Sequence, residues 1–92
     1  MRPRPVFQPD PDTRFVVEPA GVRLVHGQSE TTLGYPEAAI WDMAVRGYDL
    51  ARIVDLLRHI IGVTPAHAEQ VVFDTLQMLS ERGFGSREKA DD

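Results

Sequence analysis

The segment Thr31-Thr32-Leu33-Gly34-Tyr35-Pro36-Glu37-Ala38-Ala39-Ile40-Trp41-Asp42-Met43-Ala44-Val45-Arg46-Gly47 marks a change from strand to helix. Residues 31–33 favour β-structure, whereas Gly34 permits a sharp change of direction and Pro36 suits the first turn of a helix. Apolar residues then recur at the spacing of one helical face, and Gly47 stands where a left-handed residue ends many helices. The segment therefore predicts a strand that runs almost directly into a short, half-buried helix.

Two further strands are expected before this segment. Residues 13–18 and 22–26 are rich in β-formers and flank a turn sequence at 19–21. A second turn at 27–29 leads into a short strand at 30–33. Alternation directs one set of apolar side chains inward, namely Phe15, Val17, Val22 and Leu24. The result is a three-stranded antiparallel sheet, and its two outer strands each have an edge that could accept another chain.

Two further helices are expected after this segment. Asp49 is a good N-cap for the second helix, and Gly62 ends it. Thr64 and Pro65 give the start signal of a third helix that runs to about Arg82. The second helix carries a wide apolar stripe made of Leu50, Ile53, Val54, Leu57, Ile60 and Ile61, and Gly83 stops the third so that Phe84 folds back on it. Strands followed by helices in this order predict an α+β fold with a winged-helix-like layout.

The composition bounds the size and the compartment of the protein. With 92 residues, the chain has room for one small domain, which we place at residues 13–85. Residues 1–12 hold four prolines and are expected to form a flexible arm of which only Val6 and Phe7 touch the fold. Residues 86–92 are expected to be a disordered tail. The absence of cysteine excludes disulfides, and the lack of a long apolar run or signal peptide predicts a cytoplasmic protein without a membrane partner.

Side chains able to carry chemistry are dispersed. His26, His59 and His67 fall in three different elements. No carboxylate stands three or four residues after His59, and His67 has only Glu69 and Gln70 nearby, a poor spacing for joint metal ligation. The serines lack the strand-Gly-x-Ser-x-Gly context of a nucleophile, and no glycine-rich phosphate loop is present. We therefore expect no catalytic residue, no metal, no cofactor and no enzymatic activity. Trp41 is expected to pack under a neighbouring element rather than to recognise a ligand.

Several apolar and glycine motifs occur together in a fixed order. They are Leu33 to Trp41, Gly47, Ile53-Val54 with Leu57, Gly62-Val63, and Val72, Leu76 and Leu79 followed by Glu81-Arg82-Gly83-Phe84. On these motifs the chain resembles the PqqD family, also called the RiPP recognition element, over residues 15–84. Gly34 stands where the family has Asn, and Thr75 stands where an apolar residue is common. The Leu-Leu-Tyr-Pro-Glu run typical of dedicated PqqD proteins is missing, which argues against a role in pyrroloquinoline quinone synthesis itself.

The resemblance implies a peptide chaperone rather than an enzyme. Family members bind the leader segment of a ribosomally made precursor peptide and present it to a modifying enzyme, often a radical SAM protein. The leader pairs as an added strand between the third strand and the third helix. Carried over to this chain, the expected strand edge is Glu30, Thr31, Thr32 and Leu33. The expected helix flank is Val71, Thr75 and Met78, with Phe73 as the alternative flank.

Two other classes of function fit the same layout. A winged-helix nucleic-acid binder would need a basic recognition helix, but residues 65–83 carry Arg82 against Glu69, Asp74 and Glu81. The formal net charge of −4 also argues against nucleic acid as a partner. A structural dimerisation module would use the exposed strand edges and the broad apolar helix, so a homodimer is compatible with the pattern.

Overall fold

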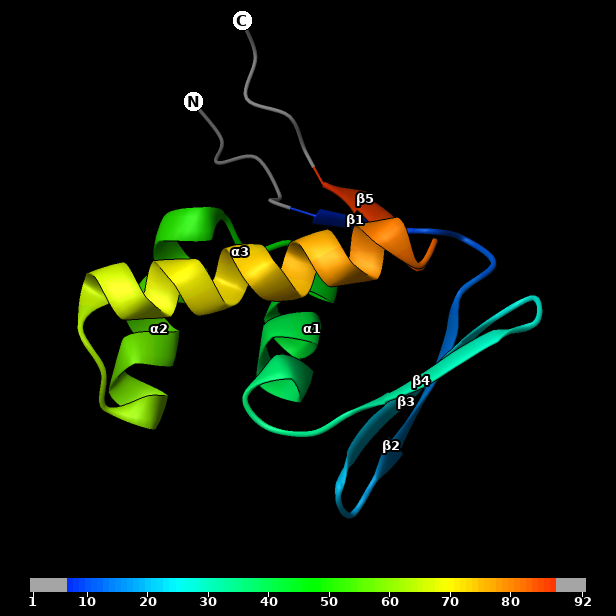
Figure 1. Ribbon diagram of the computed structural model, residues 1–92, viewed down its shortest axis with the longest axis horizontal. Coiled ribbons are helices and arrows are strands. Elements are labelled where there is room, and N and C mark those ends of the chain that lie inside the picture. Colours follow the sequence, from blue (N-terminus) through cyan, green and yellow to red (C-terminus); the bar gives the residue numbers. More distant parts are fainter. Residues whose placement is uncertain (1–6, 88–92) are drawn as a thin grey trace, which may run out of the picture.

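The computed structural model describes residues 7–87 and confirms the α+β, winged-helix-like fold class. Three antiparallel strands are followed by three helices, and a short two-stranded ribbon adds to this layout. The elements are β1 (Phe7–Pro9), β2 (Arg14–Glu18), β3 (Gly21–His26), β4 (Ser29–Leu33), α1 (Glu37–Val45), α2 (Leu50–Ile61), α3 (Pro65–Glu81) and β5 (Gly85–Arg87). Figure 1 shows the helices gathered on one side, with the sheet of β2, β3 and β4 extending away from them. Within residues 7–87, no helix is long and apolar enough to cross a membrane.

The three-stranded sheet has the order β2-β3-β4, so β3 is central and the other two strands are edges. In the β2–β3 pair, Phe15 lies opposite Leu24 and Val17 lies opposite Val22, which puts all four side chains on one face as expected. Burial differs between the two strands, however. Val22 and Leu24 belong to the core, whereas Phe15 is 49% exposed and Val17 is 76% exposed.

The expectation that Phe15 and Val17 point into the core is therefore wrong. The core is built mainly from β3, the end of β4 and the inner faces of the three helices, and β2 lies at its margin. Phe15 meets the ring of Trp41 edge-on, at 5.8 Å between centroids, and stays about half exposed. Trp41 itself is buried as predicted and also meets the ring of Phe7.

The two ends of the described chain pair with each other. Strand β1 is antiparallel to β5, with Phe7 opposite Arg87 and Pro9 opposite Gly85. This corrects the prediction of a flexible arm for residues 7–9 and of a disordered tail for residues 86–87, because pairing between distant segments leaves no local signal in so short a run. Phe7 is buried, as expected. Val6 and the rest of the predicted arm and tail, residues 1–6 and 88–92, lie outside the described residues.

Helix boundaries follow the predicted capping signals. Asp49 accepts a hydrogen bond from the Arg52 N–H at 2.8 Å, and Thr64 accepts one from the His67 N–H at 3.2 Å. After α3, the Phe84 N–H donates to the Leu79 carbonyl at 3.0 Å, and the Phe84 side chain returns to the core. One member of the predicted α2 stripe is misplaced, since Ile60 is 57% exposed. Its neighbour Ile61, in the same last turn, packs against the core, so Ile60 is on the solvent side of this turn.

Candidate functional site

The outer edge of β4 is unpaired among the described residues. The turn between β3 and β4 determines which main-chain groups of β4 bond to β3 and which point outward. Residues 27–28 form a two-residue turn that closes on the His26–Ser29 pair, and such a turn closes on a hydrogen-bonded pair. Hydrogen-bonded and non-hydrogen-bonded pairs then alternate along the ladder. Residues 29, 31 and 33 therefore direct their N–H and C=O groups at β3, whereas Glu30 and Thr32 direct theirs outward.

The end of α3 lies beside this edge. The Arg82 guanidinium, at the C-cap of α3, donates a hydrogen bond to the Thr31 hydroxyl over 3.3 Å. Thr31 lies opposite Leu24, on the sheet face that packs on the core, so this contact is made on the helix side of β4. It brings the C-terminal end of α3 next to the strand and favours the flank of α3 that leads to Arg82.

Arg82 lies on the same side of α3 as Val71, Thr75 and Met78, the flank predicted from the sequence ahead of the alternative flank at Phe73. Met78, Thr75 and Val71 precede Arg82 by four, seven and eleven residues, a spacing that keeps side chains on one side of a helix. Met78 and Val71 are half-buried against the core, whereas Thr75 is only 5% exposed. Met78 is one turn from the contact with Thr31, and Val71 is about three turns, or ~16 Å, away. Met78 is therefore the apolar side chain best placed to meet a strand added to β4.

Phe73 lies on a different side of α3. It precedes Arg82 by nine residues, which at about 100° per residue puts it half a turn round the helix from the Arg82 side. Its side chain is half-buried. By this spacing Met78 lies on the Arg82 side of α3 and Phe73 on the opposite side, so Met78 stays the predicted contact and Phe73 is the less favoured alternative.

The predicted strand residues differ in what they can offer. Glu30 and Thr32 are exposed, Thr31 is half-buried beside Arg82, and Leu33 is buried in the core. Leu33 can therefore support the edge but cannot present its side chain to a ligand. We call the set Glu30, Thr31, Thr32, Val71, Met78 and Arg82 the β4–α3 surface, and the binding of a peptide to it stays a prediction.

Charges on the two faces of β4 are unequal. On the face away from the helices, Arg23 lies 3.7 Å from Glu30 and 3.8 Å from Glu18, so these charges largely offset one another. On the helix face, Arg82 forms no ion pair with any carboxylate of the described residues. In the sequence, Arg82 stood out only as the single basic residue of its helix. Arg82 follows Met78 by four residues, which puts the two on the same side of the helix, and this spacing could have added Arg82 to the predicted site.

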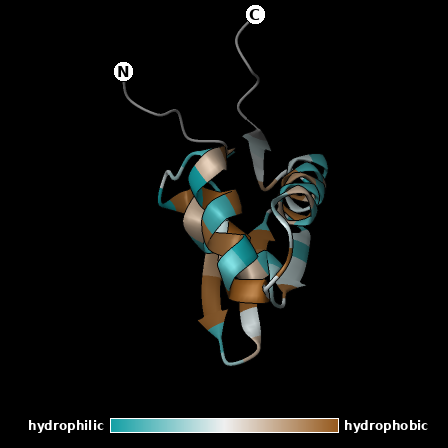
Figure 2. Ribbon diagram, turned by 90° about the vertical axis from the view of Figure 1, so that its left-hand side faces the viewer, coloured by the Kyte–Doolittle hydropathy of each residue, from teal (hydrophilic) through white to brown (hydrophobic). Residues whose placement is uncertain are grey.

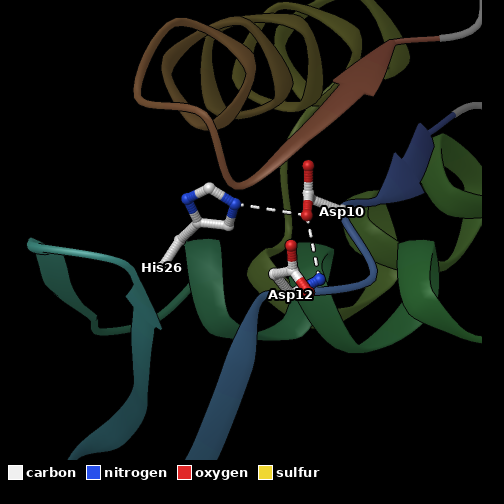
Figure 3. A group of neighbouring side chains, drawn as sticks. All are labelled: Asp10, Asp12 and His26. Carbon is white, nitrogen blue, oxygen red and sulfur yellow. Dashed lines mark hydrogen bonds and ion pairs between the residues drawn. The ribbon is translucent and has the colours of Figure 1, made fainter.

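A separate cluster joins the segment after β1 to the end of β3. His26 Nε2 lies 3.2 Å from Asp10 Oδ1, and the Asp12 N–H donates to the same oxygen over 2.9 Å (Figure 3). The ligand atoms of Asp10, Asp12 and His26 lie within 4.8 Å of one another, a convergence that was not predicted because only carboxylates near a histidine in the sequence were considered. Asp10 Oδ1 already accepts two contacts, and the Asp10 N–H donates to the Phe84 carbonyl at 3.0 Å. The cluster therefore joins the segment after β1 to the end of β3 through the contact between Asp10 and His26.

Comparison with known proteins identifies the fold. No protein-family model and no curated protein sequence matches the chain. The structure of TbiB1 in complex with the TbiA(beta) leader peptide has a TM-score of 0.82 at 21% sequence identity, covering 91% of this chain and 99% of that chain. Lasso peptide synthetase B1 complexed with the leader peptide has a TM-score of 0.81 at 20% identity, covering 88% and 98%. At these identities the likeness establishes a shared fold, and it spans nearly all of both proteins.

Proposed function

We propose that this chain binds the leader segment of a ribosomally synthesised precursor peptide and presents it to a modifying enzyme. The leader would add as a strand to β4, using the outward main-chain groups of Glu30 and Thr32. The observation that carries the proposal is the unpaired β4 edge lying beside α3, with the Arg82–Thr31 contact joining them. The two structures of the same fold, both described as complexes with a leader peptide, support this choice of ligand.

In the β4–α3 surface, the main chain and the side chains would have different roles in peptide binding. Main-chain pairing along β4 supplies affinity that depends little on peptide sequence, whereas side chains that alternate toward α3 supply selectivity. A peptide residue opposite Thr31 would point to the helix face and meet Met78 and Arg82. A peptide that continues past the strand would reach Val71. We propose a role in peptide binding rather than catalysis, with a radical SAM protein as one class of modifying enzyme that would receive the peptide.

Binding of a leader is tested by calorimetric titration with short precursor peptides encoded beside the gene. We expect one of them to bind with a dissociation constant of about 1 μM or tighter, because strand addition also fills an apolar flank. A scrambled peptide of identical composition is the matched control. Equal binding of the scrambled peptide, or no binding of any encoded leader, would contradict the proposal.

Arg82 is expected to favour leaders with an acidic residue opposite Thr31. Replacing Arg82 by Glu should weaken binding of such a leader by about tenfold, because a like charge then faces the peptide carboxylate, and added salt should shrink the difference. Arg82→Gln, which removes the charge but keeps a donor for Thr31, should give a smaller loss. The measurement is the same titration at two salt concentrations. An Arg82→Glu loss that is independent of both salt and the peptide's acidic residue would refute this role.

A further inference from the structure

We propose that two copies of this chain associate through antiparallel pairing of their β2 strands. The proposal rests on the unpaired outer edge of β2, on its exposed apolar side chains, and on a charge pattern that complements itself. It concerns the sheet edge opposite to β4 and stands independently of the proposed function.

The outer edge of β2 has free main-chain groups and exposed apolar side chains, which are the properties that allow another strand to pair with it. Residues 19–20 form a two-residue turn that closes on the Glu18–Gly21 pair. By the same alternation as in β4, residues 14, 16 and 18 direct their main-chain groups at β3. Phe15 and Val17 direct theirs outward. Three successive apolar side chains, Phe15, Val16 and Val17, are about half exposed or more, and Figure 2 shows the strand entering the lowest turn as largely hydrophobic. Such an edge readily accepts another strand.

The sequence of β2, Arg14-Phe15-Val16-Val17-Glu18, is complementary to itself when reversed. Antiparallel pairing centred on Val16 puts Arg14 of each copy opposite Glu18 of the other, and puts Phe15 opposite Val17. The Phe15–Val17 pairs join residues whose main-chain groups both point outward, as a hydrogen-bonded pair requires. Arg14 has no ion-pair partner among the described residues, and Glu18 has only Arg23 at 3.8 Å. Opposite charges directly across a strand pair stabilise it.

A hollow beside β2 gives the second copy's aromatic ring a place to pack. It has a volume of about 430 Å³ and lies between the β2–β3 turn, α1 and the end of α2. Its apolar lining includes Val17, Val22, Tyr35, Ala39, Met43 and Ile60. Val17, Tyr35 and Ile60 are all more than half exposed, so the rim is apolar and open to solvent. Phe15 of the second copy, opposite Val17 on this same sheet face, would lie against that rim and cover it.

The association would join two sheets into one of six strands, with β4 at each outer end. Both β4 edges would stay free, so the dimer and the peptide would not compete for the same main-chain groups. Peptide binding and dimer formation can therefore be measured separately on the same full-length chain.

Sedimentation equilibrium of the full chain at low salt tests the proposal. We expect a concentration-dependent mass that approaches twice that of the chain. Arg14→Glu and Glu18→Arg should each raise the dimer dissociation constant on the order of tenfold, because each puts like charges opposite one another twice per dimer. The double variant Arg14→Glu with Glu18→Arg should restore association to near the original strength. Val17→Pro, which removes an outward N–H but no bond to β3, should give a monomer that still unfolds cooperatively.

Three results would overturn the proposal. The first is a wild-type chain that stays monomeric at the highest soluble concentration. The second is a dimer that persists unchanged in all of these variants, which would assign it to another surface. The third is a double charge variant that associates no better than the single ones, which would refute the register centred on Val16. Thermal unfolding of each variant identifies loss of folding, and the exposed charge variants keep the test decisive if Val17→Pro does not fold.

Discussion

Replacing Gly21 by alanine is expected to remove most of the folded state at 37 °C. Gly21 begins β3 with φ of 152°, a backbone conformation that L side chains rarely adopt. A Cβ added there would overlap the Leu33 carbonyl oxygen and come within 2.9 Å of the Leu33 carbonyl carbon. Neither strand can shift without disturbing the β3–β4 ladder. We expect a loss of more than about 3 kcal/mol, combining backbone strain with overpacking.

The matched control is Gly34→Ala, one residue after β4. No heavy atom outside its chain neighbours lies within 4 Å of an added Cβ there, and the Gly34 φ is not positive. Chemical denaturation followed by circular dichroism should therefore show Gly34→Ala close to the original midpoint and Gly21→Ala far below it. Equal midpoints for the two variants would mean that the approach of β3 to the end of β4 is not as described.

Replacing Thr32 by proline should weaken leader binding between about tenfold and a hundredfold. The Thr32 N–H points to the free edge, so proline removes a donor that a bound strand would use, and its ring obstructs the approach of that strand. The same change should cost the fold only about 1 kcal/mol, because no ladder bond to β3 is lost. Titration with the leader gives the affinity, and thermal unfolding gives the stability.

Two variants separate the main-chain role of Thr32 from the role of its side chain and from loss of folding. Thr32→Val keeps the N–H and the branched shape while removing the hydroxyl, so it should bind the leader within about twofold of the original chain. Thr31→Pro removes an N–H that points to β3, and it should unfold the domain rather than only weaken binding. A Thr32→Pro variant that binds as tightly as the original would contradict strand addition on β4.

The helices and the three-stranded sheet could be predicted because their signals are local. Turn sequences, N-cap residues and the glycines after each helix lie within a few residues of the boundaries that they set, and Asp49 and Thr64 cap as expected. Burial was predictable where an apolar side chain lies at the centre of several elements, as for Trp41. It failed for Val17, because the exposure of an edge strand depends on how far the helices extend over it.

The remaining features depend on contacts between distant residues. The β1–β5 ribbon joins the two ends of the described chain, the Arg82–Thr31 hydrogen bond spans 51 residues, and His26 meets Asp10 through the folding of the sheet against the ribbon. No periodicity or spacing encodes such pairs. The β4 edge could be proposed in advance because it follows from strand order, whereas the choice between the two flanks of α3 rests on the Arg82 contact and stays a prediction.

The most direct test is amide hydrogen exchange measured by NMR on the full chain with and without a saturating leader peptide. Strand addition on β4 predicts that the Glu30 and Thr32 amides, which face outward in the free protein, exchange at least about tenfold more slowly in the complex. The Thr31 amide, already bonded to β3, should change much less. A complex in which the Glu30 and Thr32 amides exchange as fast as in the free protein would show that the peptide binds elsewhere.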